Sequence, residues 1–238
     1  MQDDRLSSIQ SASIQHPTPN IRDMIQIDDS TCWMLLVRHG ATANNLQRPP
    51  RLQGRGLDDP LSELGVKQAQ RTGAWLADQP IGAIYSSPLL RARQTAEAIA
   101  ALHGRPIEII QQITEADVGQ WEGLCWDEIK QRHPKEYNGF MTDAGVNPYV
   151  GGETLQQVLD RSRPALLRLM SENPGQLIVV AAHNVVNRSF MAEMLGLPLR
   201  AYRSIPQDNG GVNLLRYRNG QVKLLTVNSV LHLGDAGR

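Results

Sequence analysis

The sequence predicts an α/β domain in which helices cover both faces of a largely parallel β-sheet. Short apolar segments of strand length alternate with amphipathic helical segments, an order typical of βαβ units. Two of the apolar segments, 34–37 and 176–182, are hydrophobic at nearly every position, as expected of strands buried on both faces. The chain has 238 residues and is 41% hydrophobic, which is enough apolar material for one large core.

The first 30 residues differ in composition from the rest of the chain. They are rich in Asp, Ser, Gln and Asn and contain no apolar stretch that resembles a secretory signal. We expect residues 1–30 to form a mobile polar extension with little role in the chemistry. The folded domain is expected over residues 31–230.

The first strand is predicted over 34–37, and a polar, Gly- and Pro-rich stretch over 41–60 predicts a long functional loop. A helix is predicted over 62–78, with Ser62 as its N-cap. The residues at helical spacing in this segment are Val66, Ala69, Gly73 and Leu76.

The middle of the chain continues the alternation of strand and helix. A second strand is predicted over 81–85, followed by a helix over 89–102. A third strand candidate covers 106–110. A short helix is predicted over 127–132, and Pro134 is expected to stop it because proline cannot continue a helix interior.

Thr154 and Gln157 match a capping box, which predicts a helix whose apolar face runs over 155–169. The most hydrophobic strand follows over 176–182 and ends in His183. The segments 212–216 and 222–227 are then joined by a turn that contains Asn219-Gly220. This pattern predicts a terminal hairpin, and therefore at least one antiparallel edge strand.

Composition excludes several classes of function. The 24 basic and 24 acidic residues give zero formal charge, so no overall field attracts nucleic acid or an anionic membrane. No stretch approaches the ~20 apolar residues that span a bilayer. Cys32 and Cys125 are too few for a disulfide scaffold and lack metal-ligand spacing, which indicates passive thiols in a reducing, cytoplasmic compartment.

His39 and His183 each follow a strongly apolar strand. Because parallel strands share one carboxyl edge, where ligands bind in open α/β sheets, we expect the two imidazoles to come together. Arg38 can fork onto a phosphate, and a neutral imidazole can act as nucleophile. The alternative is that these are ordinary polar residues at strand ends. The remaining histidines are expected in solvent: His16, His103, His133 and His232.

Further candidates follow the second and third strands. Arg91 lies in the first turns of the predicted 89–102 helix, where it can complete a two-pronged phosphate clamp with Arg38. Arg93 points away from Arg91 on a helix and is expected to be a surface charge. The segment 114–123 supplies carboxylates and a tryptophan, which indicates either a proton donor or a surface loop over a buried indole.

These residues together resemble the histidine phosphatase superfamily, also called the phosphoglycerate-mutase-like family. The resemblance covers roughly residues 33–228. The matching blocks are, in chain order, Leu36-Val37-Arg38-His39-Gly40-x-Thr42-x-x-Asn45, Leu61-Ser62-Glu63-Leu64-Gly65 with Gln68-Ala69, Ser86-Ser87-Pro88-Leu89-x-Arg91-Ala92-x-Gln94-Thr95-Ala96, Glu115-x-x-x-Gly119-x-Trp121-Glu122-Gly123, Gly152-Glu153-Thr154 and His183.

The resemblance implies a three-layer α/β/α sandwich, a phosphohistidine intermediate and no required metal or other cofactor. It also implies roles for six of the matching residues. These roles are His39 as nucleophile, Arg38, Arg91 and His183 as the phosphate pocket with Asn45 beside it, and Glu115 as proton donor.

Two departures from the family pattern bear on function. The family usually has Ser-His-Gly around its second histidine, whereas this chain has Ala182-His183-Asn184. Family mutases follow the glutamate with an Arg-His-Tyr-Gly type run and carry paired arginines in a longer insertion. Here 116–119 reads Ala-Asp-Val-Gly, and 137–151 contains no arginine or lysine.

The sequence therefore favours a metal-independent phosphatase whose substrate is a small phosphorylated metabolite, a phosphomonoester that it hydrolyses. Two alternatives stay open: a mutase that returns the phosphoryl group to a bound hydroxy acid, and a phosphoester-binding protein with reduced turnover. The natural substrate is also open, because specificity is expected to come from the loops 46–59 and 127–150. The oligomeric state is not indicated, and a homodimer is one alternative.

Overall fold

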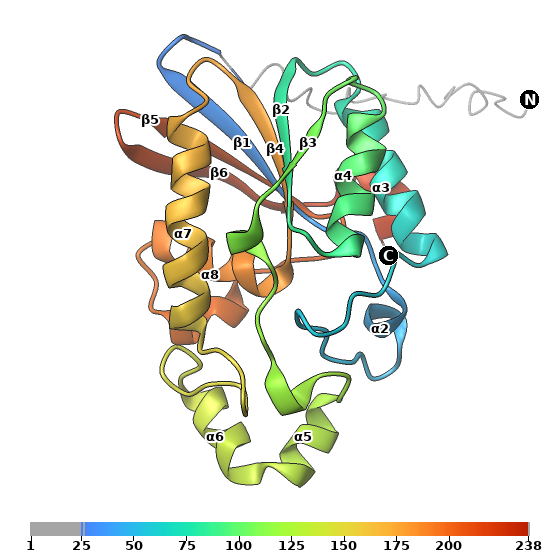
Figure 1. Ribbon diagram of the computed structural model, residues 1–238, viewed down its shortest axis with the longest axis vertical. Coiled ribbons are helices and arrows are strands. Elements are labelled where there is room, and N and C mark those ends of the chain that lie inside the picture. Colours follow the sequence, from blue (N-terminus) through green and yellow to red (C-terminus); the bar gives the residue numbers. More distant parts are fainter. Residues whose placement is uncertain (1–24, 26, 238) are drawn as a thin grey trace, which may run out of the picture.

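The computed structural model describes residue 25 and residues 27–237, which contain a six-stranded sheet in the order β3-β2-β4-β1-β5-β6 (Figure 1). The strands β3, β2, β4 and β1 pair in parallel, whereas β5 and β6 are antiparallel. The strands are β1 Thr31–Arg38, β2 Ile81–Ser86, β3 Ile107–Ile109, β4 Leu177–Ala182, β5 Val212–Arg218 and β6 Gln221–Ser229. The predicted α/β class with a mostly parallel sheet is confirmed. Most of the predicted extension over 1–30 lies outside the described residues.

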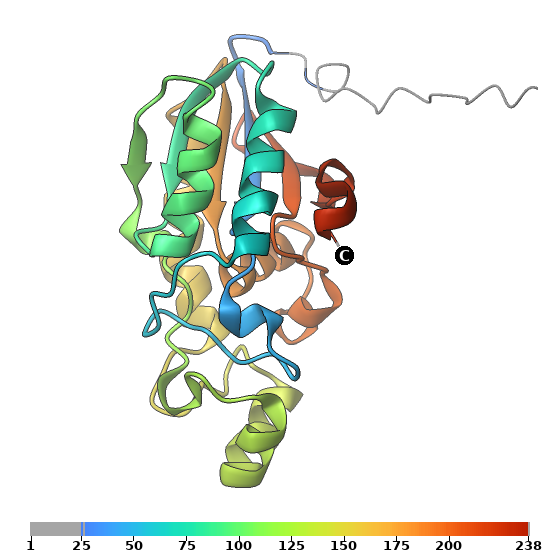
Figure 2. The same ribbon diagram turned by 90° about the vertical axis from the view of Figure 1, so that its right-hand side faces the viewer.

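Helices cover both faces of this sheet. The side chains of β1 alternate between two hydrophobic clusters, with Met34 on one face and Leu35 on the other. The first cluster contains side chains from α7 (Leu155–Ser171) and α8 (Asn184–Met194). The second contains side chains from α3 (Glu63–Leu76) and α4 (Leu90–Ala100). The predicted three-layer α/β/α sandwich is confirmed, and Figure 2 shows it turned by 90°.

The residues predicted to cap two helices and to form the hairpin turn do so in the structure. Ser62 Oγ accepts a hydrogen bond from Gly65 N at 3.1 Å. Thr154 Oγ1 accepts one from Gln157 N at 3.1 Å, and Gln157 Oε1 accepts one from Thr154 N at 2.8 Å. The turn between β5 and β6 uses Asn219 and Gly220, both with positive φ, as a tight hairpin of this twist requires.

Three α-helices were not predicted. The long loop contains α2 (Ala43–Leu46), and α8 follows directly after His183. Pro134 does end α5 (Trp126–Arg132), but it also begins α6 (Pro134–Thr142), because proline is tolerated in the first turn of a helix. In Figure 1, α5 and α6 project beyond the sheet as a separate pair. The 3₁₀ helices are η1 Gln111–Ile113, η2 Gly119–Trp121, η3 Leu199–Ser204 and η4 Leu231–Gly237.

The 3₁₀ helix η4 packs against α3, and Gln68 Nε2 donates a hydrogen bond to the Ala236 carbonyl at 2.8 Å. The prediction that His232 lies in solvent is wrong. Its ring is half-buried and stacks on Trp75, with ring centroids 4.8 Å apart. Cys32 and Cys125 are buried and unpaired with each other. Within 25 and 27–237, no helix is long and apolar enough to cross a membrane.

Candidate active site

Strand register brings the two predicted histidines to one edge of the sheet. Arg38, the last residue of β1, pairs with Ala182, the last residue of β4. His39 N donates a hydrogen bond to the Ala182 carbonyl at 3.1 Å, so the parallel pairing extends one residue further. The rings of His39 and His183 consequently lie with their centroids 5.2 Å apart.

The geometry of His39 fixes its tautomer. Its Nδ1 lies 2.7 Å from the Gly40 carbonyl oxygen, which can only accept a hydrogen bond. The proton of a neutral ring must therefore sit on Nδ1, which leaves the Nε2 lone pair free. Burial lowers the pKa of His39 well below its usual value, and the positive charges of Arg91 and Arg38 lower it further. His39 is thus neutral at physiological pH and has the electronic state that a nucleophile needs.

His183 is held by a hydroxyl that the sequence did not single out as a site residue. Its Nε2 lies 2.7 Å from Ser87 Oγ, just beyond the carboxyl end of β2. Its Nδ1 is buried and has no partner among the described residues. Burial, followed by the charge of Arg91, lowers the pKa of His183 well below its usual value. Ser87 therefore orients the second imidazole.

The two predicted clamp arginines lie at different depths. Arg38 lines the central pocket, and its Nη1 donates to the Gln207 carbonyl. Arg91 is fully buried and does not line that pocket. Its Nη1 and Nη2 donate to the carbonyls of Leu57 and Gly54 at 2.8 and 2.9 Å. Both Nε atoms are buried without a partner among the described residues, so each arginine keeps a donor for an anion.

Glu115 lies on the pocket wall and is 3% exposed. Its Oε1 accepts from Ala116 N at 2.9 Å. Its Oε2 accepts from Val185 N, in the first turn of α8, at 3.1 Å. The two amides fix the orientation of the carboxyl group, which makes the segment 114–123 part of the pocket rather than only a surface loop over Trp121.

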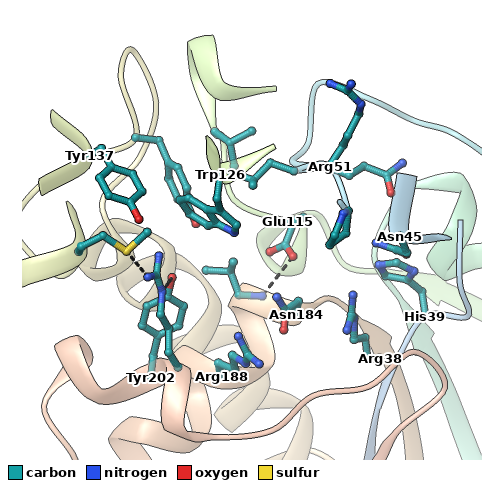
Figure 3. Close-up of a pocket in the computed structure, with 18 residues that line it drawn as sticks. Arg38, His39, Asn45, Arg51, Glu115, Trp126, Tyr137, Asn184, Arg188 and Tyr202 are labelled. Carbon is teal, nitrogen blue, oxygen red and sulfur yellow. Dashed lines mark hydrogen bonds between the residues drawn. The ribbon is translucent and has the colours of Figure 1, made fainter. Parts of the chain in front are cut away.

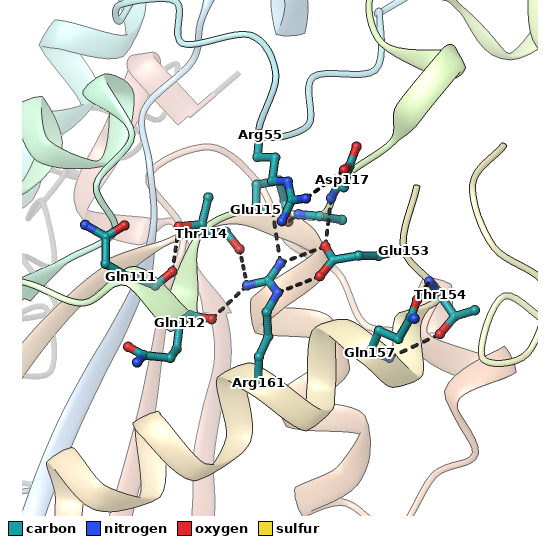
Figure 4. A network of polar contacts seen from close by, with 11 residues as sticks. Arg55, Gln111, Gln112, Thr114, Glu115, Asp117, Glu153, Thr154, Gln157 and Arg161 are labelled. Atoms are coloured by element: carbon teal, nitrogen blue, oxygen red, sulfur yellow. Dashed lines mark hydrogen bonds and ion pairs between the residues drawn. The ribbon is translucent and has the colours of Figure 1, made fainter. Parts of the chain in front are cut away.

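The loop that carries Glu115 is fastened from behind by Arg161 of α7 (Figure 4). The Arg161 guanidinium donates to both carboxylate oxygens of Glu153, at 2.8 and 3.0 Å. The same guanidinium donates to three backbone carbonyls at the start of this loop, those of Gln112, Thr114 and Glu115. Arg161 therefore holds the backbone that leads up to Glu115, and its partner Glu153 accepts a hydrogen bond from Asp117 N, just after Glu115, at 2.8 Å.

The other carboxylates of this segment are engaged elsewhere. Glu122 accepts hydrogen bonds from Gly54 N and Gly56 N at 2.6 and 3.0 Å, and burial raises its pKa. Asp117 forms an ion pair with Arg55 at 2.8 Å. Neither Glu122 nor Asp117 lines the pocket. Glu115 is accordingly the carboxyl group placed to exchange a proton with a bound ligand.

Asn45 lines the pocket beside His39. Its Oδ1 accepts from Thr42 N and from Asn209 Nδ2, each at 3.1 Å. With the carbonyl oxygen occupied in this way, the amide NH₂ group of Asn45 is the part left to donate to a ligand. Asn209 was not predicted, because a single asparagine in a coil segment gives no sequence signal.

These residues surround a cavity of about 650 Å³. Figure 3 shows Arg38, His39 and Asn45 at one end, with Glu115 beside them, which we call the histidine end. The opposite end, which we call the aromatic end, contains Trp126, Tyr137 and Tyr202 (Figure 3). Three more lining residues belong to it because they contact these or one another: Met141, Tyr149 and Arg203. The predicted specificity loops 46–59 and 127–150 both contribute to the cavity wall.

The sequence missed Arg188 of α8 and Arg203 of η3, which also line the cavity. The absence of cations from 137–151 therefore does not leave the aromatic end without positive charge. The apolar spacing of Val186, Phe190 and Met194 is a signal that could have predicted α8 and, with it, the position of Arg188. No cluster of three or more His, Cys, Asp or Glu side chains within 25 and 27–237 has the arrangement of a metal site.

The chain is similar to known proteins over most of its length. Residues 34–230 match the model of the histidine phosphatase superfamily (branch 1). The chain is 31% identical to phosphoserine phosphatase 1 of Hydrogenobacter thermophilus, covering 85% of this chain and 94% of that protein. It is 30% identical to a metal-independent phosphoserine phosphatase of Arabidopsis thaliana, covering 90% of this chain and 88% of that protein.

A solved structure gives the same result. The fold is similar to that of YhfR from Bacillus stearothermophilus, with a TM-score of 0.78, 30% sequence identity, and coverage of 85% of this chain and 99% of that one. The family match, the relatives and the paired histidines at one sheet edge agree with one another. This chain is a member of the histidine phosphatase superfamily.

Proposed function

We propose that this chain is a phosphatase that hydrolyses a small phosphomonoester through a phosphohistidine formed on Nε2 of His39, with no metal ion. The observation that carries the proposal is the contact of His39 Nδ1 with the Gly40 carbonyl oxygen at 2.7 Å, because it leaves Nε2 unprotonated in the pocket. Relatives named phosphoserine phosphatase, one of them described as metal-independent, support the same reaction class.

In the first step, Nε2 of His39 attacks phosphorus and the bond from phosphorus to the leaving oxygen breaks. The carboxyl group of Glu115 gives its proton to that oxygen, and the alcohol leaves. Arg38, Arg91 and the donor atoms of Asn45 and His183 stabilise the charge on the three equatorial oxygens. The products are an alcohol, a phosphohistidine and a Glu115 carboxylate.

In the second step, the Glu115 carboxylate takes a proton from water, and the water oxygen attacks phosphorus. The nitrogen–phosphorus bond breaks, and its electron pair returns to His39. Inorganic phosphate leaves, and Glu115 is protonated again. A single carboxyl group therefore serves both half-reactions, which suits its fixed position between two backbone amides.

We further infer that the partner of this site is a small phosphorylated metabolite and that the protein works in the cytoplasm without binding nucleic acid or membrane. The zero formal charge and the two buried, unpaired cysteines support this inference. The mutase alternative has weaker support, since 137–151 lacks the paired arginines. Release of free phosphate without a bisphosphate activator distinguishes a phosphatase from a mutase.

The direct test is His39→Ala. We expect it to abolish phosphate release from p-nitrophenyl phosphate, while the melting temperature stays close to that of the wild type, because among the described residues the ring hydrogen-bonds only to its neighbour Gly40. Rapid acid-free quenching of wild-type protein should trap base-stable phosphate on one histidine. The matched control is His103→Ala, which lies after α4 and outside the pocket. Near-normal phosphate release by His39→Ala would overturn the proposal, and so would a wild type that binds phosphate without turnover.

A further inference from the structure

Helix α8 presents two polar side chains to the cavity, each with a buried atom that no described residue satisfies. Asn184 and Arg188 are four residues apart and therefore lie on the same face of the helix. Both line the cavity. Asn184 Oδ1 and Arg188 Nε are buried and have no hydrogen-bond partner among the described residues. Buried polar atoms are nearly always paired in folded proteins, so such atoms on a cavity wall indicate the place of a ligand.

Arg203 reaches the same cavity from η3 and is held by aromatic rings. Its guanidinium carbon lies 4.8 Å from the centre of the Trp126 ring and 5.5 Å from that of Tyr202. Its Nε donates to the Tyr202 hydroxyl at 3.1 Å, and its Nη1 contacts the Met141 sulfur. These contacts fix the position of the cation without neutralising it.

The charges around the cavity do not balance. Among the described residues that line it, Glu115 carries the only carboxylate. Arg51 is neutralised by Glu128 at 2.9 Å, and Arg38 faces the place of the phosphoryl group. Arg188 and Arg203 form no ion pair with any residue in 25 and 27–237.

Arg188 and Arg203 also repel each other. Burial lowers the pKa of Arg188, and the charge of Arg203 adds to this effect. In Figure 3, Asn184 lies close to Arg38, whereas Arg188 lies beside Tyr202, on the side away from His39. Two unpaired cations at this position favour an anion other than the phosphoryl group that is attacked.

We propose that Arg188 and Arg203 form a second anion-binding subsite, so that the preferred substrate carries a carboxylate or a second phosphate besides the phosphoryl group cleaved at His39. The proposal rests on the proposed phosphatase function. A cavity of about 650 Å³ has room for a substrate with two anionic ends. Arg188 and Arg203 are specificity-determining residues in this assignment, and the cleavage chemistry stays with the histidine end.

The test compares substrates that differ only in the second anion. O-phosphoserine against O-phosphoethanolamine reports on a carboxylate, and glucose 1,6-bisphosphate against glucose 6-phosphate reports on a second phosphate. We expect the wild type to prefer the more anionic member of at least one pair by about 10-fold or more in kcat/KM, the usual effect of hydrogen bonds to a charged group. The pair that shows the preference identifies the chemical source of the anion.

Two variants test whether the substrate preference comes from the subsite. Arg188→Gln and Arg203→Gln should each reduce the preference by about 10-fold, with a smaller loss on the less anionic member. Arg200→Gln, an exposed position of the same 3₁₀ helix outside the cavity, is the matched control and should keep the preference. A wild-type preference near one for both pairs, or a preference that neither variant reduces, would overturn the subsite.

A binding measurement separates this proposal from the phosphatase proposal. Calorimetric titration of His39→Ala with O-phosphoserine and O-phosphoethanolamine measures the preference without turnover. If no ester is hydrolysed by the wild type while the binding preference and its loss in the double variants His39→Ala/Arg188→Gln and His39→Ala/Arg203→Gln persist, the phosphatase proposal fails and the subsite stands. If p-nitrophenyl phosphate is hydrolysed but neither pair shows a preference in turnover or binding, the subsite fails and the phosphatase stands.

Discussion

The histidine end of the pocket is carried by the sheet, whereas the aromatic end is carried by short helices beyond it. His39 follows a strand buried on both faces and is itself 3% exposed. Trp126 and Tyr137 lie on α5 and α6, are only partly buried, and belong to a pair of helices that projects from the sheet (Figure 1). In the function that we propose, strand register fixes the position of the reacting groups, and substrate choice depends on elements that can vary without moving the strands.

The strongest test of this comparison changes geometry but not charge at the histidine end. Arg38→Lys and Arg91→Lys should each lower kcat/KM for p-nitrophenyl phosphate by ~10²–10³, because an ammonium cannot replace a planar fork of preorganised donors. Arg91→Lys should also lower the melting temperature, since the buried guanidinium holds the carbonyls of Gly54 and Leu57.

Arg93→Lys is the matched control, because Arg93 lies two residues from Arg91 on α4 and is exposed, as predicted. It should keep wild-type kinetics and stability. An arginine variant at 38 or 91 that keeps most of its kcat/KM would place that side chain outside the phosphate site.

A smaller effect is expected at Arg161, a positioning residue that acts through the Glu115 loop. Arg161→Met removes the hydrogen bonds to Glu153 and to the loop carbonyls, so the carboxyl group of Glu115 loses its fixed position. We expect a loss of about 10- to 100-fold with an alkyl phosphate, because misplaced catalytic groups are costly. The loss should be smaller with p-nitrophenyl phosphate, whose leaving group needs no proton.

Arg163→Met is the control on the same helix. Its side chain forms an exposed ion pair with Glu193 at 3.4 Å, which contributes at most ~1 kcal/mol to stability. Equal losses with both substrates in Arg161→Met would show that Arg161 only stabilises the fold and does not position Glu115.

The sequence predicted the histidine end because its residues are tied to strand ends. An apolar run identifies a strand, and parallel pairing places whatever follows Val37-Arg38 and Ala181-Ala182 at one edge. Ser87 was quoted as part of a motif but not as a site residue, since its contact with His183 depends on the register of β2 against β4. Local pattern does not encode such a register.

The aromatic end was predicted only as two loops without a readable signature. Arg188 lies in α8, whose apolar residues do recur at helical spacing, although the two valines of its first turn are β-branched and weaken that signal. Arg203 lies in a six-residue 3₁₀ helix, which is too short to show periodicity. Their position at the cavity follows from the packing of α8 and η3, and tertiary packing is not visible in the order of the residues.

The smallest expected effect is a pH dependence of stability that comes from the histidine end and not from the aromatic end. Burial lowers the pKa of both His39 and His183 in the folded state, whereas the unfolded chain binds a proton near the ordinary value of ~6.5. The unfolded state therefore holds more protons on acidification. The stabilising effect of the neutral rings is fully present above about pH 7 and is lost as pH falls below ~6.5.

We expect the urea concentration at the midpoint of unfolding to fall as the pH is lowered from about 7.5 to about 5.5. Ordinary carboxyl groups titrate below this pH range. His39→Asn and His183→Asn should each make that fall smaller. Some of it should remain in both variants, because burial also lowers the pKa of His232 to about 4. Arg203→Gln at the aromatic end should leave the fall unchanged, since arginine stays protonated throughout this range. A fall that neither histidine variant reduces would mean that His39 and His183 do not exclude protons in the folded protein, and the free Nε2 on which the proposed attack depends would lose its support.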